Sequence, residues 1–502
     1  MKKNFLGLAF LLSQVAFAQQ TTVATQYAQL ITPADLKENL SIIASDAMEG
    51  RYTGTRGQKM AAAFINSHFE NLGLVAPVNG SHYMPVELTS MKPGEIYMKS
   101  GVTRYNNFNE IVYLGQTDSG GEISIDAVYA GNGTEADYAY VDVKDKAVVI
   151  FNPSLSFEAM GKMRQSTKLA RDKGARIVFV VSGGKPEEFK PFAEQLKGFF
   201  GTGSLSLNKP DPNASKGTFL IDQSIAVKIF NTPFEKLMKA TSEEASKKAL
   251  AKIKPSRIVY QVSMETKTVK SENMLGYLEG TDKKDELIVI SAHFDHIGLH
   301  EGDDKVNNGA DDDGSGTVSV LQLAKAFAQA KKEGHGPRRS ILFMTVTGEE
   351  EGLFGSQYYV EHPVFPLANT VADLNIDMVG RKDAEHNGKP DYVYVIGSDK
   401  LSSELHEINE RNNKTYTQLE FDYTYNDENH PTNLYKRSDH WNFAKNNVPI
   451  IFYFDGIHED YHKPSDEVSK IDFDLLAKRD KIVFYTAWEL ANRDNRIVVD
   501  KK

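Results

Sequence analysis

Short apolar segments recur through the second half of this 502-residue chain and limit the folds that it can adopt. Helical sequence separates them, most clearly at 316–331 and 355–361. Apolar runs of this length are typical of strands buried on both faces, and strands that alternate with helices form parallel sheets. We therefore predict an α/β fold in which a mainly parallel, mixed sheet is sandwiched by helices. The predicted strands are Leu287–Ser291, Ser340–Thr347, Val371–Asp377 and Val448–Asp455.

Polar side chains lie at the carboxyl end of each predicted strand. The first strand is followed by His293 and Asp295, the second by glutamates 349–351, the third ends at Asp377, and the fourth leads to His462. Because ligands of open α/β sheets bind beyond the carboxyl ends of the strands, we expect these groups to meet at one edge. Imidazole and carboxylate groups, in a chain without cysteine, suit a divalent metal such as zinc.

Each of these motifs also has a simpler interpretation. A His-x-Asp pair occurs often by chance, and the Asp/Gly-rich segment 309–316 is typical of a turn. The glutamates 349–351 could form the charged start of a helix, where the helix dipole favours acids. The convergence of separate strands on one edge favours a metal site over these alternatives.

The motifs resemble a known family when they are taken together. They are AHFDH at 292–296, NGADDDGSG at 308–316, GEEEGL at 348–353, NIDM at 375–378 and YHKPSD at 461–466. In this order they resemble the co-catalytic zinc exopeptidase family of bacterial leucyl aminopeptidase, aminopeptidase S and glutamate carboxypeptidase II, whose relatives include the transferrin receptor. The resemblance covers residues 30–118 and 255–495, and it implies a zinc-exopeptidase-like fold.

The resemblance also implies a site with two zinc ions. The implied ligands are His293 and Asp377 for one ion, Glu350 and His462 for the other, and Asp311 as the bridge. The peptide between Asp311 and Asp312 is cis in this family. Since oxygen and nitrogen ligands also suit other divalent ions, Co²⁺ or Mn²⁺ could replace zinc.

Two further acids have implied catalytic roles. Asp295 would hold the second ring nitrogen of His293, which fixes the tautomer and basicity of that ligand. Glu349 would be the general base that takes a proton from a water and passes it to the leaving amine.

The remaining histidines carry weaker signals. We expect surface or local hydrogen-bonding roles for His296, His300, His335, His362, His386 and His406. Ser438-Asp439-His440 is no serine-protease triad, because groups adjacent in sequence cannot relay a proton among themselves. We expect His440 to line the substrate pocket and stabilise an oxyanion, and Lys436 or Arg437 to hold a substrate carboxylate.

Residues 1–18 have two lysines, an apolar core and a small-x-small end, which predicts a secretory signal peptide cleaved after Ala18. We therefore expect a periplasmic or extracellular protein, and no later stretch approaches the ~20 apolar residues of a membrane span. The expected domains are 19–118, the N-terminal part of the peptidase domain, then an insert at 119–254, and the di-zinc peptidase domain at 255–502. The insert is a smaller α/β domain that resembles a protease-associated domain. The net charge of −10 argues against a nucleic-acid partner.

The function expected from these observations is that of a secreted zinc aminopeptidase acting on peptides. Alternatives within the same fold are a glutamate-type carboxypeptidase and a glutaminyl cyclase, which uses one zinc. A non-catalytic receptor-like protein is less consistent with the sequence, because such proteins lose metal ligands and every ligand position is filled here. The sequence does not indicate an oligomeric state or a side-chain preference.

Overall fold

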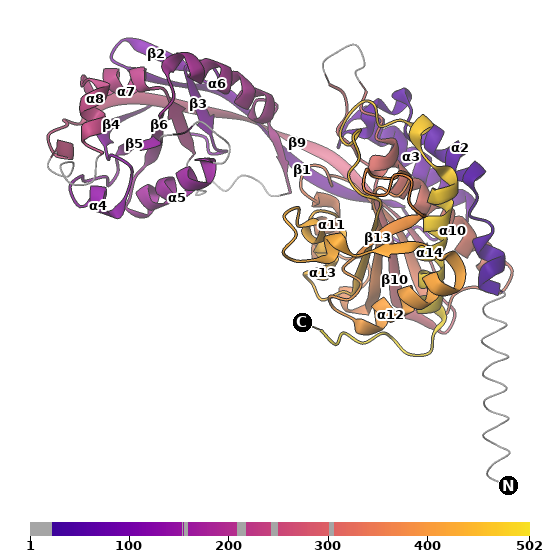
Figure 1. Cartoon of the computed structure of the whole chain (residues 1–502). Coiled ribbons are helices and arrows are strands. Elements are labelled where there is room, and N and C mark those ends of the chain that lie inside the picture. The colour runs from indigo at the N-terminus through magenta and orange to yellow at the C-terminus, as the bar shows by residue number, and fades with distance from the viewer. Residues whose placement is uncertain are drawn as a thin grey trace, which may run out of the picture. The chain divides into compact units, whose positions relative to one another are not determined.

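The computed structural model describes residues 23–152, 154, 159–207, 217–241, 249–300 and 306–501. The predicted signal peptide, residues 1–18, lies outside these ranges. The chain divides into two compact units, one of Met1–Glu87 with Lys270–Lys502 and one of Leu88–Val269 (Figure 1). In the described part of the chain, no helix has the length and apolar character needed to cross a bilayer.

The second unit is larger than the predicted insert at 119–254. Its limits fall inside two long strands, β1 (Tyr83–Ser100) and β9 (Ser256–Leu278), each of which contributes residues to both units. Strand β9 is continuous across the boundary between the two units. A boundary inside a continuous strand has no turn or linker sequence to mark it, which explains the difference.

The first unit is built on a mixed sheet with the strand order β14-β13-β15-β12-β10-β11-β9. The central strands β11, β10, β12 and β15 run parallel, whereas β9 on β11 and β13 on β15 are antiparallel. The four predicted strands are these central ones. Strand bounds are β10 Lys283–His293, β11 Arg339–Val346, β12 Thr370–Ile376, β13 Tyr392–Ile396, β14 Glu420–Asp422 and β15 Ile450–Phe454.

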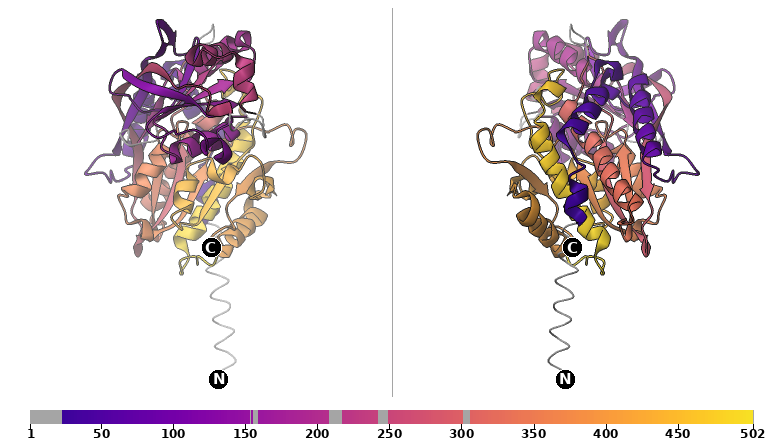
Figure 2. Two further views of the ribbon diagram at one scale, coloured as in Figure 1. Left: turned by 90° about the vertical axis from the view of Figure 1, so that its left-hand side faces the viewer. Right: turned by 90° about the vertical axis from the view of Figure 1, so that its right-hand side faces the viewer.

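Helices cover both faces of this sheet, as the alternating side chains of β10 require. Ile288 and Ile290 share a buried cluster with α2, α3, α10, α12 and α14. The right-hand view of Figure 2 shows α14 (yellow) beside α2 (indigo) on this unit. Leu287 and Val289 point the other way, into a cluster with α11 and α13. The bounds are α2 Pro33–Ile43, α3 Arg56–Asn71, α10 Gly316–Lys332, α11 Phe354–Glu361, α12 Ser403–Asn412, α13 His440–Ala444 and α14 Phe473–Asn492.

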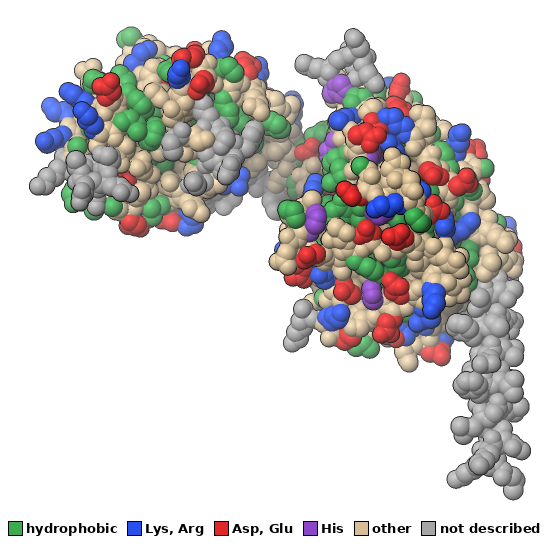
Figure 3. All heavy atoms as spheres, viewed as in Figure 1, with side chains coloured by type: hydrophobic (Ala, Val, Ile, Leu, Met, Phe, Trp, Pro, Cys, Tyr) green, Lys and Arg blue, Asp and Glu red, His purple; other side chains and the backbone are tan. Residues whose placement is uncertain are grey.

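Burial on both faces explains why the central strands have apolar side chains at almost every position. Fully burying one such side chain is worth about 1.5–3 kcal/mol, so the paired clusters hold the sheet rigidly. Local signals also act: at the start of α2 the Thr32 hydroxyl accepts from the amide of Asp35, and proline occupies the first helical position. The outer surface in Figure 3 shows acidic and basic side chains interspersed on this unit.

The second unit has its own sheet, in the order β9-β4-β5-β6-β8-β3, and its own buried clusters. Strands β4, β5, β6 and β8 are parallel, while β9 and β3 are antiparallel edges. Helix α8 covers Phe234–Lys239, and residues 242–248 lie outside the described part of the chain. The other helices and strands of the second unit are β2 Thr103–Asn106, β3 Ile111–Leu114, β4 Ile123–Tyr129, α4 Glu135–Tyr138, β5 Ala147–Asn152, α5 Ala159–Asp172, β6 Ile177–Ser182, α6 Pro186–Phe200, β7 Ser204–Ser206, β8 Thr218–Ile221 and α7 Gln223–Phe230.

An acidic residue within β12 should make the stability of the protein depend on pH. Asp373 is fully buried, accepts one hydrogen bond from the hydroxyl of Ser291 at 2.7 Å, and leaves Oδ2 without a partner among the described residues. Burial, with a smaller contribution from the charge of Asp439, raises the pKa of Asp373 to about 8. The folded protein therefore keeps a proton that the unfolded chain releases near pH 4.

The contribution of this carboxyl to the free energy of unfolding falls as pH rises from about 4 to about 8, by up to ~1.4 kcal/mol per pH unit. Asp373→Asn keeps an acceptor for Ser291 but has no charge to bury. We expect the variant to gain roughly 2–3 kcal/mol over the parent protein between pH 6 and pH 8. Urea unfolding at both pH values measures this difference, and a difference that does not change with pH would contradict it.

Candidate metal centre

The carboxyl ends of the parallel strands are aligned at one edge of the sheet. His293, the last residue of β10, is paired with Val346 at the end of β11, while Ser291 is paired with Asn375 near the end of β12. The acids that follow β11 and β12 therefore emerge beside His293. This register brings together side chains that are far apart in the sequence.

Two groups of potential ligands lie at this edge. In the first, Nε2 of His293 is 3.3 Å from Oδ1 of Asp312, 3.6 Å from Oδ1 of Asp377 and 4.0 Å from Oε2 of Glu349. In the second, Nε2 of His462 is 3.1 Å from Oδ2 of Asp312 and 3.0 Å from Oε2 of Glu350. The carboxylate of Asp312 thus lies between the two histidines.

The position expected for Asp311 is occupied by its neighbour Asp312. The cis peptide joins Asp312 to Asp313, and not Asp311 to Asp312 as expected. The carboxylate of Asp311 instead accepts from the amide of Gly380 at 2.6 Å and lies 3.2 Å from Nε2 of His458. Three consecutive aspartates give no internal register, so a one-residue error could not be detected from this sequence alone.

Other acids accept hydrogen bonds from the backbone of the loop that contains Asp311, Asp312 and Asp313. The carboxylate of Asp466 accepts from the amides of Asp311 and Asp312, at 3.0 and 3.1 Å. Asp313 accepts from the amides of His293, Gly316 and Met378. Burial and the nearby charge of Asp377 raise the pKa of Asp313 well above its usual value. We had assigned no role to Asp312, Asp313 or Asp466.

An arginine from the N-terminal part of the chain supports the same loop. Arg51 is fully buried, and its guanidinium donates to the carbonyl oxygens of residues 43, 294, 308 and 309 at 2.7–2.9 Å. Gly50 beside it has a φ of +64°, and a Cβ there would lie 2.5 Å from the carbonyl oxygen of Gly298. A buried arginine that binds carbonyl groups leaves no periodic pattern, so the sequence predicts no role for Arg51.

Asp295 is in the site, but its contacts differ from those expected. Nδ1 of His293 donates to the main-chain oxygen of Asp295 at 3.0 Å, and the carboxylate lies farther away at 3.8 Å. That carboxylate accepts from the amide of Glu349 at 3.2 Å and the hydroxyl of Thr53 at 2.9 Å. The bond to Nδ1 leaves Nε2 of His293 free to face the acids, while the carboxylate holds Glu349.

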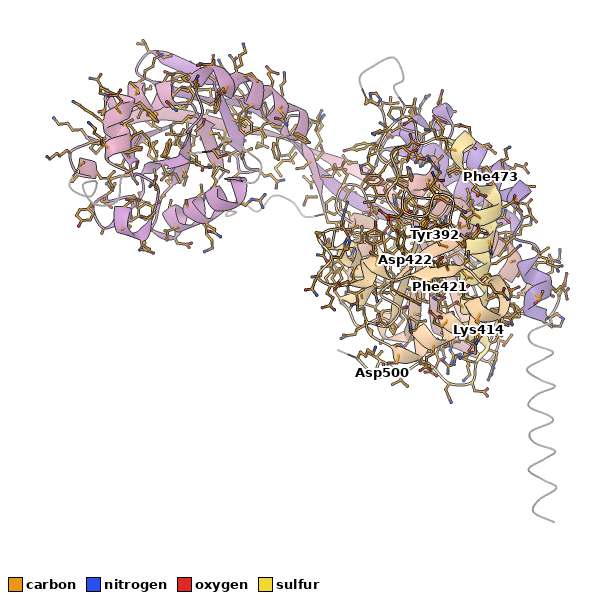
Figure 4. All side chains as sticks on the ribbon, in the orientation of Figure 1. Tyr392, Lys414, Phe421, Asp422, Phe473 and Asp500 are labelled. Carbon is orange, nitrogen blue, oxygen red and sulfur yellow. The ribbon has the colours of Figure 1, made fainter. Side chains whose placement is uncertain are left out.

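Among the remaining histidines, His296 is the one that enters the site. It is fully buried and its Nδ1 donates to Oε1 of Glu350 at 2.8 Å, whereas we expected a surface or local role. His300, His335 and His362 are exposed. His386 is buried, as a local hydrogen-bonding group: it lies between Asp383 and Asp422 of β14 and stacks on Tyr392 of β13, with 3.5 Å between ring centres. Figure 4 labels Tyr392 and Asp422, which belong to paired strands.

His440 does not line the cleft described below, so the expectation of an oxyanion role for it is wrong. Its ring is fully buried and stacks on Phe452, and its Nε2 donates to the carbonyl oxygen of Tyr435 at 2.9 Å. Burial lowers the pKa of His440 to about 3. The ring is therefore a neutral packing group.

A cleft opens over the two ligand groups. Acids form its floor, and an apolar wall, Arg437 and Ser438 complete it. The lining residues are Asp312, Glu349, Glu350, Asp377, Met378, Leu434, Arg437, Ser438, Phe452, Phe454, Ile457 and Tyr461.

The polar atoms of these side chains are arranged as ligands of divalent cations and not as hydrogen-bond partners of one another. Oδ2 of Asp312 and Nε2 of His462 are buried and 3.1 Å apart, yet neither makes a hydrogen bond with any described residue. Buried polar atoms without partners are costly, and ligands that both face an ion have this arrangement. The atoms of His293, Glu349 and Asp377, and those of His296, Asp312 and Glu350, each lie within 4.8 Å of one another. This donor set suits zinc.

Comparison with known proteins identifies the segment that carries these groups. Residues 273–487 match the sequence profile of peptidase family M28. This segment belongs to peptidase family M28. The family expected from the motifs is therefore confirmed, and the M28 segment contains every ligand discussed above. Arg51 and Thr53 lie outside it.

Relatives of the M28 segment include fungal enzymes. A probable zinc metalloprotease of Pyrenophora tritici-repentis is 25% identical over 272 residues, 47% of this chain and 53% of that protein. A probable leucine aminopeptidase of Arthroderma benhamiae is 29% identical over 216 residues, 42% of this chain and 55% of that protein. This chain thus spans about half the length of the curated relatives that it matches.

A solved aminopeptidase from Aneurinibacillus sp. strain AM-1 has the same fold. It is 19% identical, with a TM-score of 0.56, and the match covers 95% of this chain and 98% of that one. At this identity the likeness concerns the fold alone. It agrees with the predicted α/β class and the mainly parallel sheet between helices.

Proposed function

We propose that this protein is a zinc-dependent aminopeptidase that removes N-terminal residues from peptides. The observation that carries the proposal is the carboxylate of Asp312 between His293 and His462, with Asp377 and Glu350 completing the two groups. In the proposed site His293 and Asp377 would hold one ion, Glu350 and His462 would hold the other, and Asp312 would be shared between them. Two separate groups favour a pair of ions over the single zinc of a cyclase.

Bound zinc would polarise the scissile carbonyl and lower the pKa of an attacking water. Proton transfer from that water requires a side chain of the protein, and Glu349 is the proposed general base. Its carboxyl lines the cleft, and its amide is held by Asp295. Burial raises the pKa of Glu349 well above its usual value, although the nearby His293 opposes this shift. A carboxyl of raised pKa accepts a proton from water and returns it to the leaving nitrogen.

The walls of the cleft position the substrate in this proposal. Ser438 donates to Oδ2 of Asp377 at 2.6 Å, which fixes the orientation of that ligand. The apolar wall, with Leu434, Phe452 and Phe454, favours an apolar side chain on the residue that is removed. Arg437, the cation in the cleft, suits a carboxylate, and this observation keeps a glutamate-type carboxypeptidase as the second candidate.

Two further parts of the proposal rest on the sequence. The charge, apolar and small-residue order of residues 1–18 supports export to the periplasm or beyond. The unit Leu88–Val269, with its own α/β core, is proposed to be a protease-associated domain.

A substrate panel tests the proposal. Leucyl 4-nitroanilide and an N-acetylated dipeptide ending in glutamate are incubated with the zinc-loaded protein, with and without chelator. We expect release from the anilide that chelator abolishes and zinc restores. Hydrolysis of the acetylated peptide alone would favour the carboxypeptidase, and hydrolysis that chelator does not affect would refute a metallopeptidase.

A further inference from the structure

On the basis of the proposed peptidase function, we infer that the guanidinium of Arg437 binds the α-carboxylate of the residue that follows the scissile bond. The best substrates are then peptides with one residue after that bond, which for an aminopeptidase means dipeptides. The inference concerns the substrate class of the site and applies equally to a carboxypeptidase, where the same carboxylate belongs to the residue released.

The charges in the cleft give the first reason. Its floor presents four acids, Asp312, Glu349, Glu350 and Asp377, whose negative charge the proposed metal ions would offset, so the floor itself offers a substrate carboxylate no protein cation. Among the described residues that line the cleft, Arg437 is the one lysine or arginine. A substrate carboxylate in this cleft therefore has a single protein cation to bind.

The position of Arg437 gives the second reason. Its amide donates to the carbonyl oxygen of Leu434 at 3.1 Å, and the next residue, Ser438, donates to the proposed ligand Asp377. The backbone of Arg437 is thus fixed next to Ser438, which contacts a proposed metal ligand. Its exposed guanidinium makes no hydrogen bond or ion pair with any described residue, so its N–H donors are available. A planar fork of donors matches a carboxylate with two parallel bonds.

The neighbouring cation is already engaged elsewhere. The ammonium of Lys436 lies 5.3 Å from the centre of the Trp441 ring, and Lys436 is absent from the described lining of the cleft. Of the two cations that the sequence offered for a substrate carboxylate, the structure favours Arg437. Lys436 therefore provides a matched control for the loss of one positive charge at adjacent positions.

The test compares Leu-Ala with its C-terminal amide and with Leu-Ala-Ala, using the zinc-loaded full chain. We expect kcat/KM for the free dipeptide to exceed that for the amide by roughly 10- to 100-fold, the range for a charge-assisted pair. In Arg437→Met this ratio should fall to about one, whatever the change in absolute rate, and in Lys436→Met it should stay at the parent value. Equal rates on dipeptide and amide in the parent protein would overturn the inference.

A binding measurement keeps this result separate from the proposed function. Calorimetric titration with alanine and alaninamide reports carboxylate recognition without any hydrolysis. If no leucyl substrate is cleaved but alanine binds more tightly than alaninamide only while Arg437 is present, the aminopeptidase proposal fails and the carboxylate site stands. If neither rate nor binding distinguishes acid from amide, the carboxylate site is refuted.

Discussion

Replacing Glu349 by glutamine is expected to reduce kcat for leucyl 4-nitroanilide by about 10²- to 10⁴-fold, the usual contribution of a general base. The amide keeps the size of the side chain but cannot accept the proton of the attacking water. Glu349 lines the cleft, and its Oε2 lies 4.0 Å from Nε2 of His293, but it is not one of the proposed metal ligands. The zinc content of the variant should therefore stay near two per chain. Metal analysis and initial rates on the same sample measure both quantities.

The adjacent turn provides the control. Glu351 follows two residues later, carries the same charge and is hydrogen-bonded to Tyr52 at the edge of the site. Glu351→Gln should therefore retain activity within a few-fold, whereas Glu349→Gln should not. Full activity of Glu349→Gln with zinc bound would assign the proton transfer to another group.

The second large effect concerns the choice between two adjacent aspartates. Asp312→Asn replaces the carboxylate between His293 and His462 by a neutral amide. We therefore expect the zinc content to fall from about two per chain toward zero, with loss of activity. A ligand at a thousand times its dissociation constant stabilises the fold by about 4 kcal/mol, so zinc should no longer raise the melting temperature of this variant.

Asp311→Asn is the matched control for this experiment. Asp311 faces Gly380 and His458, away from the two ligand groups, and the variant should keep zinc and most of its activity. If Asp311→Asn loses zinc while Asp312→Asn keeps it, the bridging position belongs to Asp311, as the motif first suggested.

The parts of the fold that the sequence predicts are those with strong periodic signals. The central strands β10, β11, β12 and β15 were predicted because burial on both faces makes them apolar throughout. Strand β14 is three residues long and partly exposed, and β13 is a five-residue strand, so neither stood out from the loops around it. Helix α14 was not predicted either, because most of its residues are buried and its sequence lacks the one-sided apolar pattern of a surface helix.

The candidate site was predictable where each ligand has a strand to place it. His293 is the last residue of β10, Asp377 directly follows β12 and Glu350 comes shortly after β11, so their convergence follows from the parallel order. The aspartate run has no such reference, and its register depends on a cis bond and on the amides held by Asp466. His296 and His440 were misjudged because burial of a histidine depends on tertiary packing, which a single sequence does not reveal.

The bonds from Arg51 link the beginning of the chain to a carbonyl 243 residues later, at Phe294. During synthesis at 5–20 residues per second, Arg51 would leave the ribosome roughly 12–50 seconds before that partner exists. For this interval the apolar side chains of α2 and α3 have no sheet to pack against and stay exposed to water. The metal site is therefore among the last parts of the protein to form, and a chain stopped before Phe294 cannot acquire it.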